Sequence, residues 1–275
     1  MRTRVNKTDY LLSLIREGKK MTLKQQLKLT VYLSIPAIMA QLSSIVMQYV
    51  DASMVGSLGA NASASIGLVS TTTWLFWGLC AAAATGFSVQ VAHLIGAGNF
   101  AGARKILRQS ITATLLFGSS LATIGVFISD SLPGWLGGDE IIRKDSSVYF
   151  LIFSLFLPVL QMNFLASGML RCSGNMYIPS ILNILMCLLD IIFNFFLIFP
   201  KRQIEIMGLN IDIYGAGLGV KGAALGTVLA ELVTARGMMW YLCYRSPILK
   251  LSGERGHFLL RPFTVKADVN VNINK

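Results

Sequence analysis

Charged residues are scarce in this sequence. Only 13% of its 275 residues are Asp, Glu, Lys or Arg, whereas 54% are hydrophobic. A soluble globular chain carries about 25% charged residues, so the composition excludes an ordinary soluble domain. The net charge of +11 does not indicate a nucleic-acid-binding protein, because the basic residues lie at the ends of apolar segments rather than on one solvated face.

Cysteine and histidine are also few. The four cysteines include no C-x-x-C pair, and only two histidines occur in the whole chain. This spacing provides neither a disulfide framework nor a zinc site, and we expect the cysteines to act as small buried hydrophobes. Without a nucleophile–base pair or a metal cluster, the sequence predicts neither an enzyme nor a bound cofactor.

Long apolar segments dominate the rest of the sequence. A transmembrane helix needs about 20 consecutive apolar residues, and the joints between these segments are rich in Gly and Asn, as turns require. The sequence therefore predicts an all-α, polytopic membrane protein, a bundle of six transmembrane helices. The predicted helices cover residues 30–57, 63–95, 106–131, 147–170, 178–199 and 220–244.

The distribution of charge predicts how this bundle is oriented. Of the 24 basic residues, 18 lie in the two ends and in the loops on one side of the bundle, and the loops on the other side hold five basic and six acidic residues. By the positive-inside rule, both ends lie in the cytoplasm and the protein spans the cytoplasmic (inner) membrane.

Three regions follow from this topology. Residues 1–29 are predicted to form a basic amphipathic cytoplasmic N-terminus, either a helix lying on the anionic inner leaflet or a solvated tail. Residues 30–244 form the membrane lobe, and residues 245–275 form a cytoplasmic linker or tail.

Charged side chains inside the apolar segments are costly in a bilayer, so each is a candidate functional residue. They are Asp51, Asp190, Glu231 and Arg236. At 1.5 Å per residue, Asp51 and Asp190 both lie roughly 9–15 Å below the outer surface. We therefore expect these two carboxylates to meet at one level, where they could bind a cation or share a proton.

Uncharged polar residues accompany these acids at helical spacing. Asn194 follows Asp190 by one turn, and Thr227 shares a face with Glu231. In the first segment, the polar side chains fall within an arc of about 100°, which must face other helices or water: Ser34, Gln41, Ser44, Gln48 and Asp51. Hydrogen bonding between helices is the simpler explanation for the serines and for Asn183, whereas Glu231 fits a structural and a functional role equally well.

Four motifs in this order resemble the multidrug and toxic compound extrusion (MATE) transporters, with a leaning toward the DinF-like branch. They are VDASMVGSLG at 50–59, QVAHLIGAGN at 90–99, LRCSGN at 170–175 and GAALGT at 222–227. The resemblance implies twelve helices in two six-helix lobes, with export of organic cations driven by inward H⁺ or Na⁺. This chain would be the N-terminal lobe, with the second six-helix lobe missing. It is interpreted as a fragment, a truncated product or a lobe that pairs with another chain.

The resemblance also implies roles for individual residues. Asp51 matches the acid of the family's first helix, and Pro36 matches the proline where that helix bends. Tyr149 and Thr227 fall on matching polar positions, and Ser167 falls where some relatives carry an asparagine.

The fifth helix departs from the family's pattern. Many relatives carry Asn-x-x-x-Asp there, whereas this chain has the acid first, at Asp190, and the amide second, at Asn194. The exchange keeps the number of acids but moves the charge by about 6 Å along the helix.

The sequence thus predicts a cation-coupled antiporter lobe. The ion-coupling residues are Asp51, Asp190, Asn194, Thr227 and Tyr149, of which all but Tyr149 are candidate Na⁺ ligands. Candidate cavity-lining residues are Gln41, Gln48, Ser167, Asn183 and Glu231. One alternative is a flippase for lipid-linked precursors of the same superfamily, in which an arginine-rich cavity would be expected. The other is a membrane interaction module that transports nothing.

Overall fold

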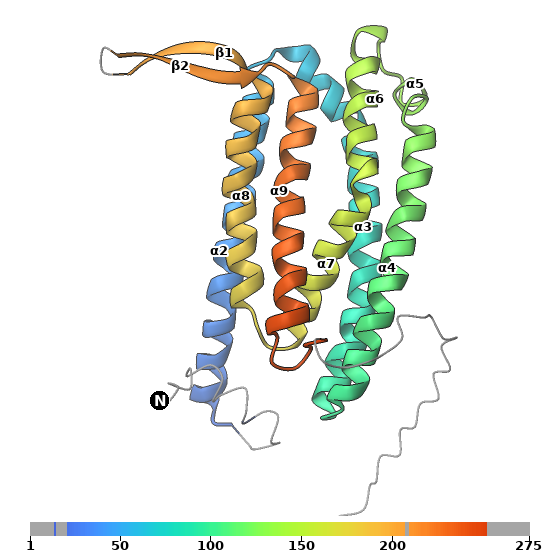
Figure 1. Cartoon of the computed structure of the whole chain (residues 1–275), viewed down its shortest axis with the longest axis vertical. Coiled ribbons are helices and arrows are strands. Elements are labelled where there is room, and N and C mark those ends of the chain that lie inside the picture. Colours follow the sequence, from blue (N-terminus) through green and yellow to red (C-terminus); the bar gives the residue numbers. More distant parts are fainter. Residues whose placement is uncertain (1–13, 15–20, 207–208, 252–275) are drawn as a thin grey trace, which may run out of the picture.

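The computed structural model describes residue 14, residues 21–206 and residues 209–251. The predictions for residues 1–13, 15–20 and 252–275, which include most of both cytoplasmic ends, therefore lie outside the described residues. Within the described part, long helices run roughly parallel to one another and form a bundle (Figure 1).

The long helices follow the predicted apolar segments closely. Four of them are long and apolar enough to cross a membrane: α2 (Leu23–Gly56), α3 (Ala60–Gly96), α4 (Phe100–Ile128) and α8 (Tyr177–Ile198). Helix α9 (Val220–Trp240) lies beside them in the bundle (Figure 1) and is extended by the π-helical turn η1 (Tyr241–Arg245). It is not among those four, and it carries Lys221, Glu231 and Arg236.

The fourth predicted segment is two helices rather than one. Helices α6 (Glu140–Leu155) and α7 (Leu157–Cys172) meet at a bend of 48° and together qualify as one broken span. Pro158 lies in the first turn of α7. Because proline has no backbone N–H, it cannot continue the hydrogen-bond ladder of the preceding helix. The structure therefore has four to five candidate spans by length and composition, rather than six uninterrupted ones.

Helix α2 begins at Leu23, before the predicted start at residue 30. Thr22 caps it: the Thr22 hydroxyl accepts from the backbone N–H of Gln25, and the Gln25 side chain accepts from the N–H of Thr22. This reciprocal arrangement is a capping box. It places the helix start in the basic, polar stretch, where hydropathy alone gives no signal.

Glycines form the joints between the helices. Six of them have positive φ, which L-residues rarely adopt, and all six fall in the predicted turns: Gly59, Gly98, Gly137, Gly174, Gly217 and Gly219. At the joint between α3 and α4, Asn99 is the N-cap of α4, and its side chain accepts a hydrogen bond from the backbone N–H of Gly102.

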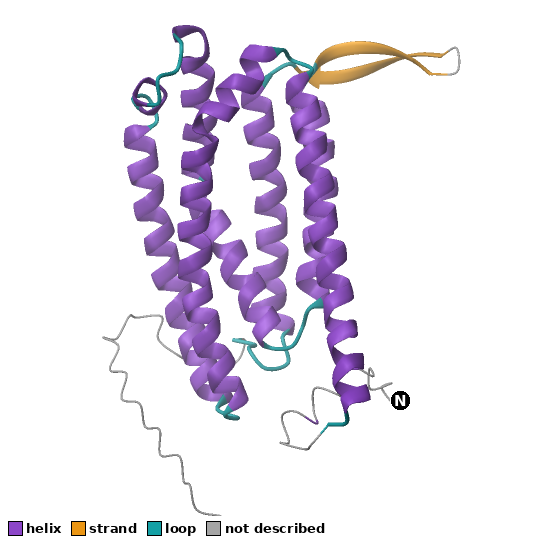
Figure 2. Ribbon diagram, turned by 180° about the vertical axis from the view of Figure 1, so that it is seen from behind, coloured by secondary structure: helices purple, strands orange, loops and turns teal. Residues whose placement is uncertain are grey.

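A two-stranded hairpin, which lies outside the six predicted apolar segments, projects from the end of the bundle between α8 and α9 (Figure 2). Strand β1 (Pro200–Ile206) pairs antiparallel with β2 (Leu209–Ala216), and Lys201 forms an ion pair of 3.7 Å with Asp212. The short helix α5 (Leu132–Trp135) lies at the same end.

Two groups of helices build the bundle. Helices α2, α8 and α9 pack side by side, and α3, α4, α6 and α7 form the remainder, with α7 packing against both α3 and α9. Apolar clusters fill the bundle near each end, around Leu170 and Leu242 at one end and around Phe76 and Phe150 at the other.

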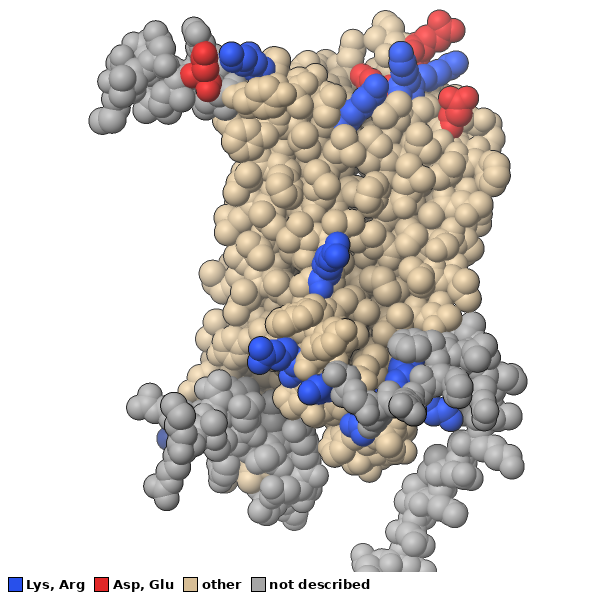
Figure 3. Space-filling view, viewed as in Figure 1, with Lys and Arg blue, Asp and Glu red and all other residues tan. Residues whose placement is uncertain are grey.

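On the face shown in Figure 3, the visible charged side chains lie at the two ends of the bundle, apart from one basic side chain within the wide uncharged band between them. On this face, one end shows only basic residues, and the opposite end shows both signs. This is the distribution that the positive-inside rule uses, and the orientation itself stays a prediction.

Candidate functional site

The structure brings Asp51 and Asp190 together through one amide. The Asn194 side chain on α8 donates to Asp51 Oδ1 on α2 at 2.9 Å and to Asp190 Oδ2 on its own helix at 3.2 Å. Since Asp51 Oδ1 and Asp190 Oδ2 accept hydrogen bonds from the same nitrogen, these two oxygens are at most about 6 Å apart. The expected meeting of the two carboxylates at one depth is therefore a feature of the fold.

The pair is withdrawn from the surface of the bundle. Asp190 is fully buried and Asn194 is 1% exposed, whereas Asp51 is half-buried on the side of α2 that faces α8. Asp190 Oδ1 and Asn194 Oδ1 are buried without a hydrogen-bond partner among the described residues. These are two oxygen acceptors that a cation or a proton donor could satisfy.

Thr227 and Tyr149 lie around this pair. The Thr227 side chain on α9 is close enough to interact with Asp190, and its hydroxyl also donates to the carbonyl of Ala223 at 3.2 Å. Tyr149 on α6 is within electrostatic range of both Asp51 and Asp190. All five predicted ion-coupling residues are thus gathered from α2, α6, α8 and α9, and their role stays a prediction.

Close packing of α9 on α8 makes this meeting possible. A Cβ on Gly226 would collide with Asn194 Oδ1, and one on Gly222 would lie 2.6 Å from the carbonyl carbon of Leu197. Gly222 and Gly226 thus form a G-x-x-x-G packing motif, because the two backbones can approach this closely only where side chains are absent.

Glu231 has a partner that sequence reasoning missed. The Asn163 side chain on α7 donates a hydrogen bond to Glu231 Oε2 on α9. The signal was present, since Asn163 is one of two amides, with Gln161, within the fourth apolar segment, but only the fold shows that it meets Glu231 on α9. Asn163 Oδ1 is buried and has no hydrogen-bond partner in the described part of the chain.

The other candidate cavity residues are dispersed. Gln41 and Gln48 are exposed on α2, and Ser167 is half-buried on α7. Asn183 on α8 donates to the Ala40 carbonyl at 3.2 Å and to Ser44 Oγ at 2.9 Å, so it connects α8 to α2.

Helix α2 continues through Pro36 without a break. Pro36 lines a hollow of about 310 Å³ between α2 and α8. Pro36 lies fifteen positions before Asp51, which is roughly 22 Å along the helix. The hollow is therefore separate from the acid pair.

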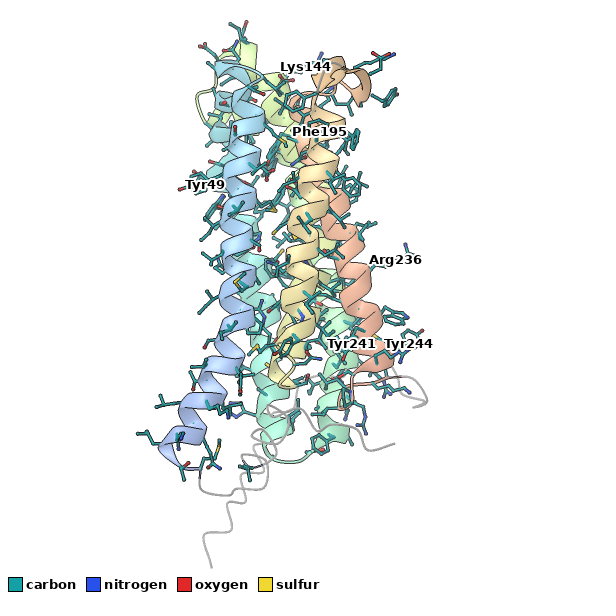
Figure 4. The ribbon with its side chains drawn as sticks, turned by 90° about the vertical axis from the view of Figure 1, so that its left-hand side faces the viewer. Tyr49, Lys144, Phe195, Arg236, Tyr241 and Tyr244 are labelled. Atoms are coloured by element: carbon teal, nitrogen blue, oxygen red, sulfur yellow. The ribbon has the colours of Figure 1, made fainter. Side chains whose placement is uncertain are left out.

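The outer face of α2 is notably exposed. Of the apolar 18-residue stretch of α2, only 11% is buried in the bundle. Tyr49, whose side chain is 75% exposed, points away from the other helices (Figure 4). The acid pair thus lies directly behind a helix whose opposite face makes few contacts within the described residues.

No three His, Cys, Asp or Glu side chains in the described ranges are grouped so that they could hold a metal ion. A site for Na⁺ would therefore need the amide and hydroxyl oxygens of Asn194 and Thr227 beside the two carboxylates, since hard cations accept neutral oxygen ligands.

Comparisons with known proteins agree with this architecture. The chain is 24% identical over 179 residues to a protein named FAD transporter from Shewanella oneidensis, covering 64% of this chain and 40% of that one. It is 25% identical over 179 residues to the probable multidrug resistance protein NorM of Thermotoga maritima, covering 64% and 38%. The chain thus spans less than half the length of these relatives.

A solved structure described as the outward-facing conformation of a multidrug resistance MATE family transporter superposes with a TM-score of 0.73 at 23% identity. The superposition covers 87% of this chain and 48% of that one, which is the coverage expected for one lobe. The MatE family model matches residues 36–196. The chain therefore belongs to the MATE family of membrane transporters.

Proposed function

We propose that this chain is the N-terminal lobe of a cation-coupled antiporter that exports organic cations across the cytoplasmic membrane. The observation that carries the proposal is the bridge of Asp51, Asn194 and Asp190 inside the bundle. The membership in the MATE family and the coverage of about half of each relative support it.

Repulsion between the two carboxylates is what would make the pair responsive to an ion. Two negative charges about 6 Å apart repel by about 3 kcal/mol at an effective dielectric constant of about 20. Binding one proton, or one Na⁺, removes that repulsion. The amide of Asn194 can donate to either acid, so it holds the pair together in both states.

Ion binding would then act on the helix that carries Asp51. Helix α2 touches the rest of the lobe mainly through α8, so a change in the attraction between Asp51 and α8 shifts the position of α2. Pro36 leaves one backbone carbonyl of α2 without its usual donor and permits a bend there. Such a movement would alter the cavity and release an organic cation outward.

The acids argue against the flippase alternative. The buried polar groups at this level are carboxylates, amides and hydroxyls, whereas a phosphate-bearing precursor needs cationic partners. Arg236 is exposed and points away from the bundle (Figure 4). The same repulsion would act on an anionic substrate such as the one in the name of the Shewanella oneidensis relative.

The test is dye efflux from cells that lack their own multidrug exporters and express this chain within its complete reading frame. We expect Asp51→Asn to reduce efflux of a cationic dye to the level of cells without the protein. The matched control is Asp145→Asn, which removes an exposed acid of α6 and should leave efflux unchanged. Full efflux by the Asp51→Asn variant would refute the proposal.

Two further arms identify the coupling ion and the alternatives. A protonophore should stop efflux if H⁺ is coupled, whereas a Na⁺ ionophore should stop it if Na⁺ is. Proteoliposomes with the 275-residue chain alone provide the remaining arm. Ion-driven dye flux there would show that the lobe suffices, and its absence, with flux from the complete reading frame, would show that the second lobe is needed.

A further inference from the structure

Glu231 forms its own polar contact, apart from the acid pair. It lies one turn after Thr227 on α9 and receives its hydrogen bond from Asn163 on α7. Its carboxylate is within electrostatic range of Asp190, yet no hydrogen bond joins Glu231 to Asp190 or Asp51 in the described part of the chain. The lobe therefore contains two separate polar centres, one between α2 and α8 and one between α7 and α9.

No positive charge compensates Glu231 within the described ranges. Its hydrogen-bonding partner is a neutral amide, and Arg236, the basic residue nearest to it in sequence, points away from the bundle (Figure 4). The titratable groups of the neighbouring helices at this level include Asp190 and Cys187 on α8, Asp51 on α2 and Tyr149 on α6, none of which is basic. A carboxylate in such surroundings is costly as an anion unless it gains a proton or a cation.

Asn163 is suited to both protonation states of Glu231. Its amide N–H donates to an ionised carboxylate, as it does in this structure. Its Oδ1, buried without a partner in the described residues, could accept from the O–H of a protonated carboxyl after rotation of the amide. An asparagine offers both a donor and an acceptor, so it can stabilise the acid with and without the proton.

We infer that Glu231 and Asn163 form a second proton-binding site in this lobe, which gains and loses its proton separately from the Asp51–Asp190 pair. Glu231 holds the proton, and Asn163 is the positioning residue. The inference deepens the proposed function, because a lobe with two such sites couples transport to two ions. Its test, however, measures protonation and does not require transport.

The experiment is infrared difference spectroscopy of the purified chain in lipid during a pH titration. Protonated carboxyl groups have a C=O stretch that is resolved from that of carboxylates. We expect two buried carboxyl signals that titrate separately. Glu231→Gln should remove one of them and reduce proton uptake by one per chain, and Asp51→Asn should alter the other while the Glu231 signal remains present. The control Asp145→Asn should leave both signals intact.

Asn163→Leu provides a second readout that a merely structural role would not produce. It removes the hydrogen bond without removing the acid, so the Glu231 signal should remain but move in frequency and in titration midpoint. Thermal unfolding of each variant verifies that the bundle is intact. If Glu231→Gln removes no titrating signal from a folded protein, or if Asn163→Leu leaves the signal of Glu231 unmoved, the inference is wrong. Neither outcome bears on the dye efflux of Asp51→Asn, which tests the proposed function separately.

Discussion

The Asn194 side chain on α8 donates a hydrogen bond of 2.9 Å to Asp51 on α2, which lies 143 positions earlier in the chain. The same nitrogen also contacts Asp190, one turn away on α8. One amide thus connects the acid of the first long helix to the acid of the fifth predicted segment. Four predictions follow from the way α8 packs on its neighbours and from the broken helix α6–α7.

The first concerns the order of acid and amide on α8. Asn194→Asp replaces the donor by a third carboxylate, so both hydrogen bonds to the acids are lost at a cost of about 1–3 kcal/mol per buried group left unpaired. The double variant Asp190→Asn/Asn194→Asp again has one acid and one amide, in the order that the family resemblance implies for this helix. We expect the double variant to retain more dye efflux than Asn194→Asp. Equal losses in both would show that the identity of each position matters more than the bridge.

The second prediction concerns the contact between α8 and α9. In Gly226→Ala, the new methyl group collides with Asn194 Oδ1, and overpacking of this kind costs about 1–3 kcal/mol. Thermal unfolding in detergent should show a lower midpoint. Gly86→Ala on α3 is the matched control, because nothing lies within 4 Å of its added Cβ. Its midpoint should be unchanged or higher, since alanine favours a helix over glycine. A Gly226→Ala midpoint equal to that of the control would contradict the close packing.

Asn183 is predicted to stabilise the bundle without taking part in coupling. Asn183→Leu removes its two hydrogen bonds to α2, and polar contacts between membrane helices contribute about 0.6 kcal/mol on average. We therefore expect a small decrease in the unfolding midpoint and normal dye efflux. Abolished efflux from a protein of normal stability would instead place Asn183 in the transport machinery.

The fourth prediction concerns the break between α6 and α7. Pro158→Ala supplies the missing N–H, so the helix should straighten from its bend of 48° and the distance between its ends should increase. Spin labels at Ile141 and Arg171, both exposed, can measure this in a variant whose four cysteines are replaced. Pro36→Ala, which alters α2 only, is the control and should not change that distance. An unchanged distance in Pro158→Ala would mean that packing, not the proline, maintains the bend.

Much of this architecture is readable from local chemistry. The apolar segments predict the long helices because a helix that crosses the hydrocarbon core of a bilayer needs a continuous apolar surface. Turn glycines such as Gly98 and Gly174 are readable because positive φ strongly favours glycine. Asp51 and Asp190 stand out as candidate functional residues because an ionisable group in an apolar helix is costly.

Other features are not given by the apolar segments. The hairpin of β1 and β2 lies in a joint between two of them, and its signal is the alternation of apolar and polar residues over 209–213. The broken helix α6–α7 has no hydropathy signal, because Pro158 lies inside a continuous apolar segment. Asn163 is one amide among many apolar residues, and its importance comes entirely from its contact with Glu231.

The sequence alone determined which segments are helical and which polar groups cannot face lipid, because those properties depend on composition and on spacing along one helix. Only the tertiary structure decided which of these groups meet. Asp51 pairs with Asn194 because α2 packs along α8, and Glu231 pairs with Asn163 because α7 packs against α9. Such contacts between residues far apart in the chain depend on how whole helices pack, and no local pattern encodes them.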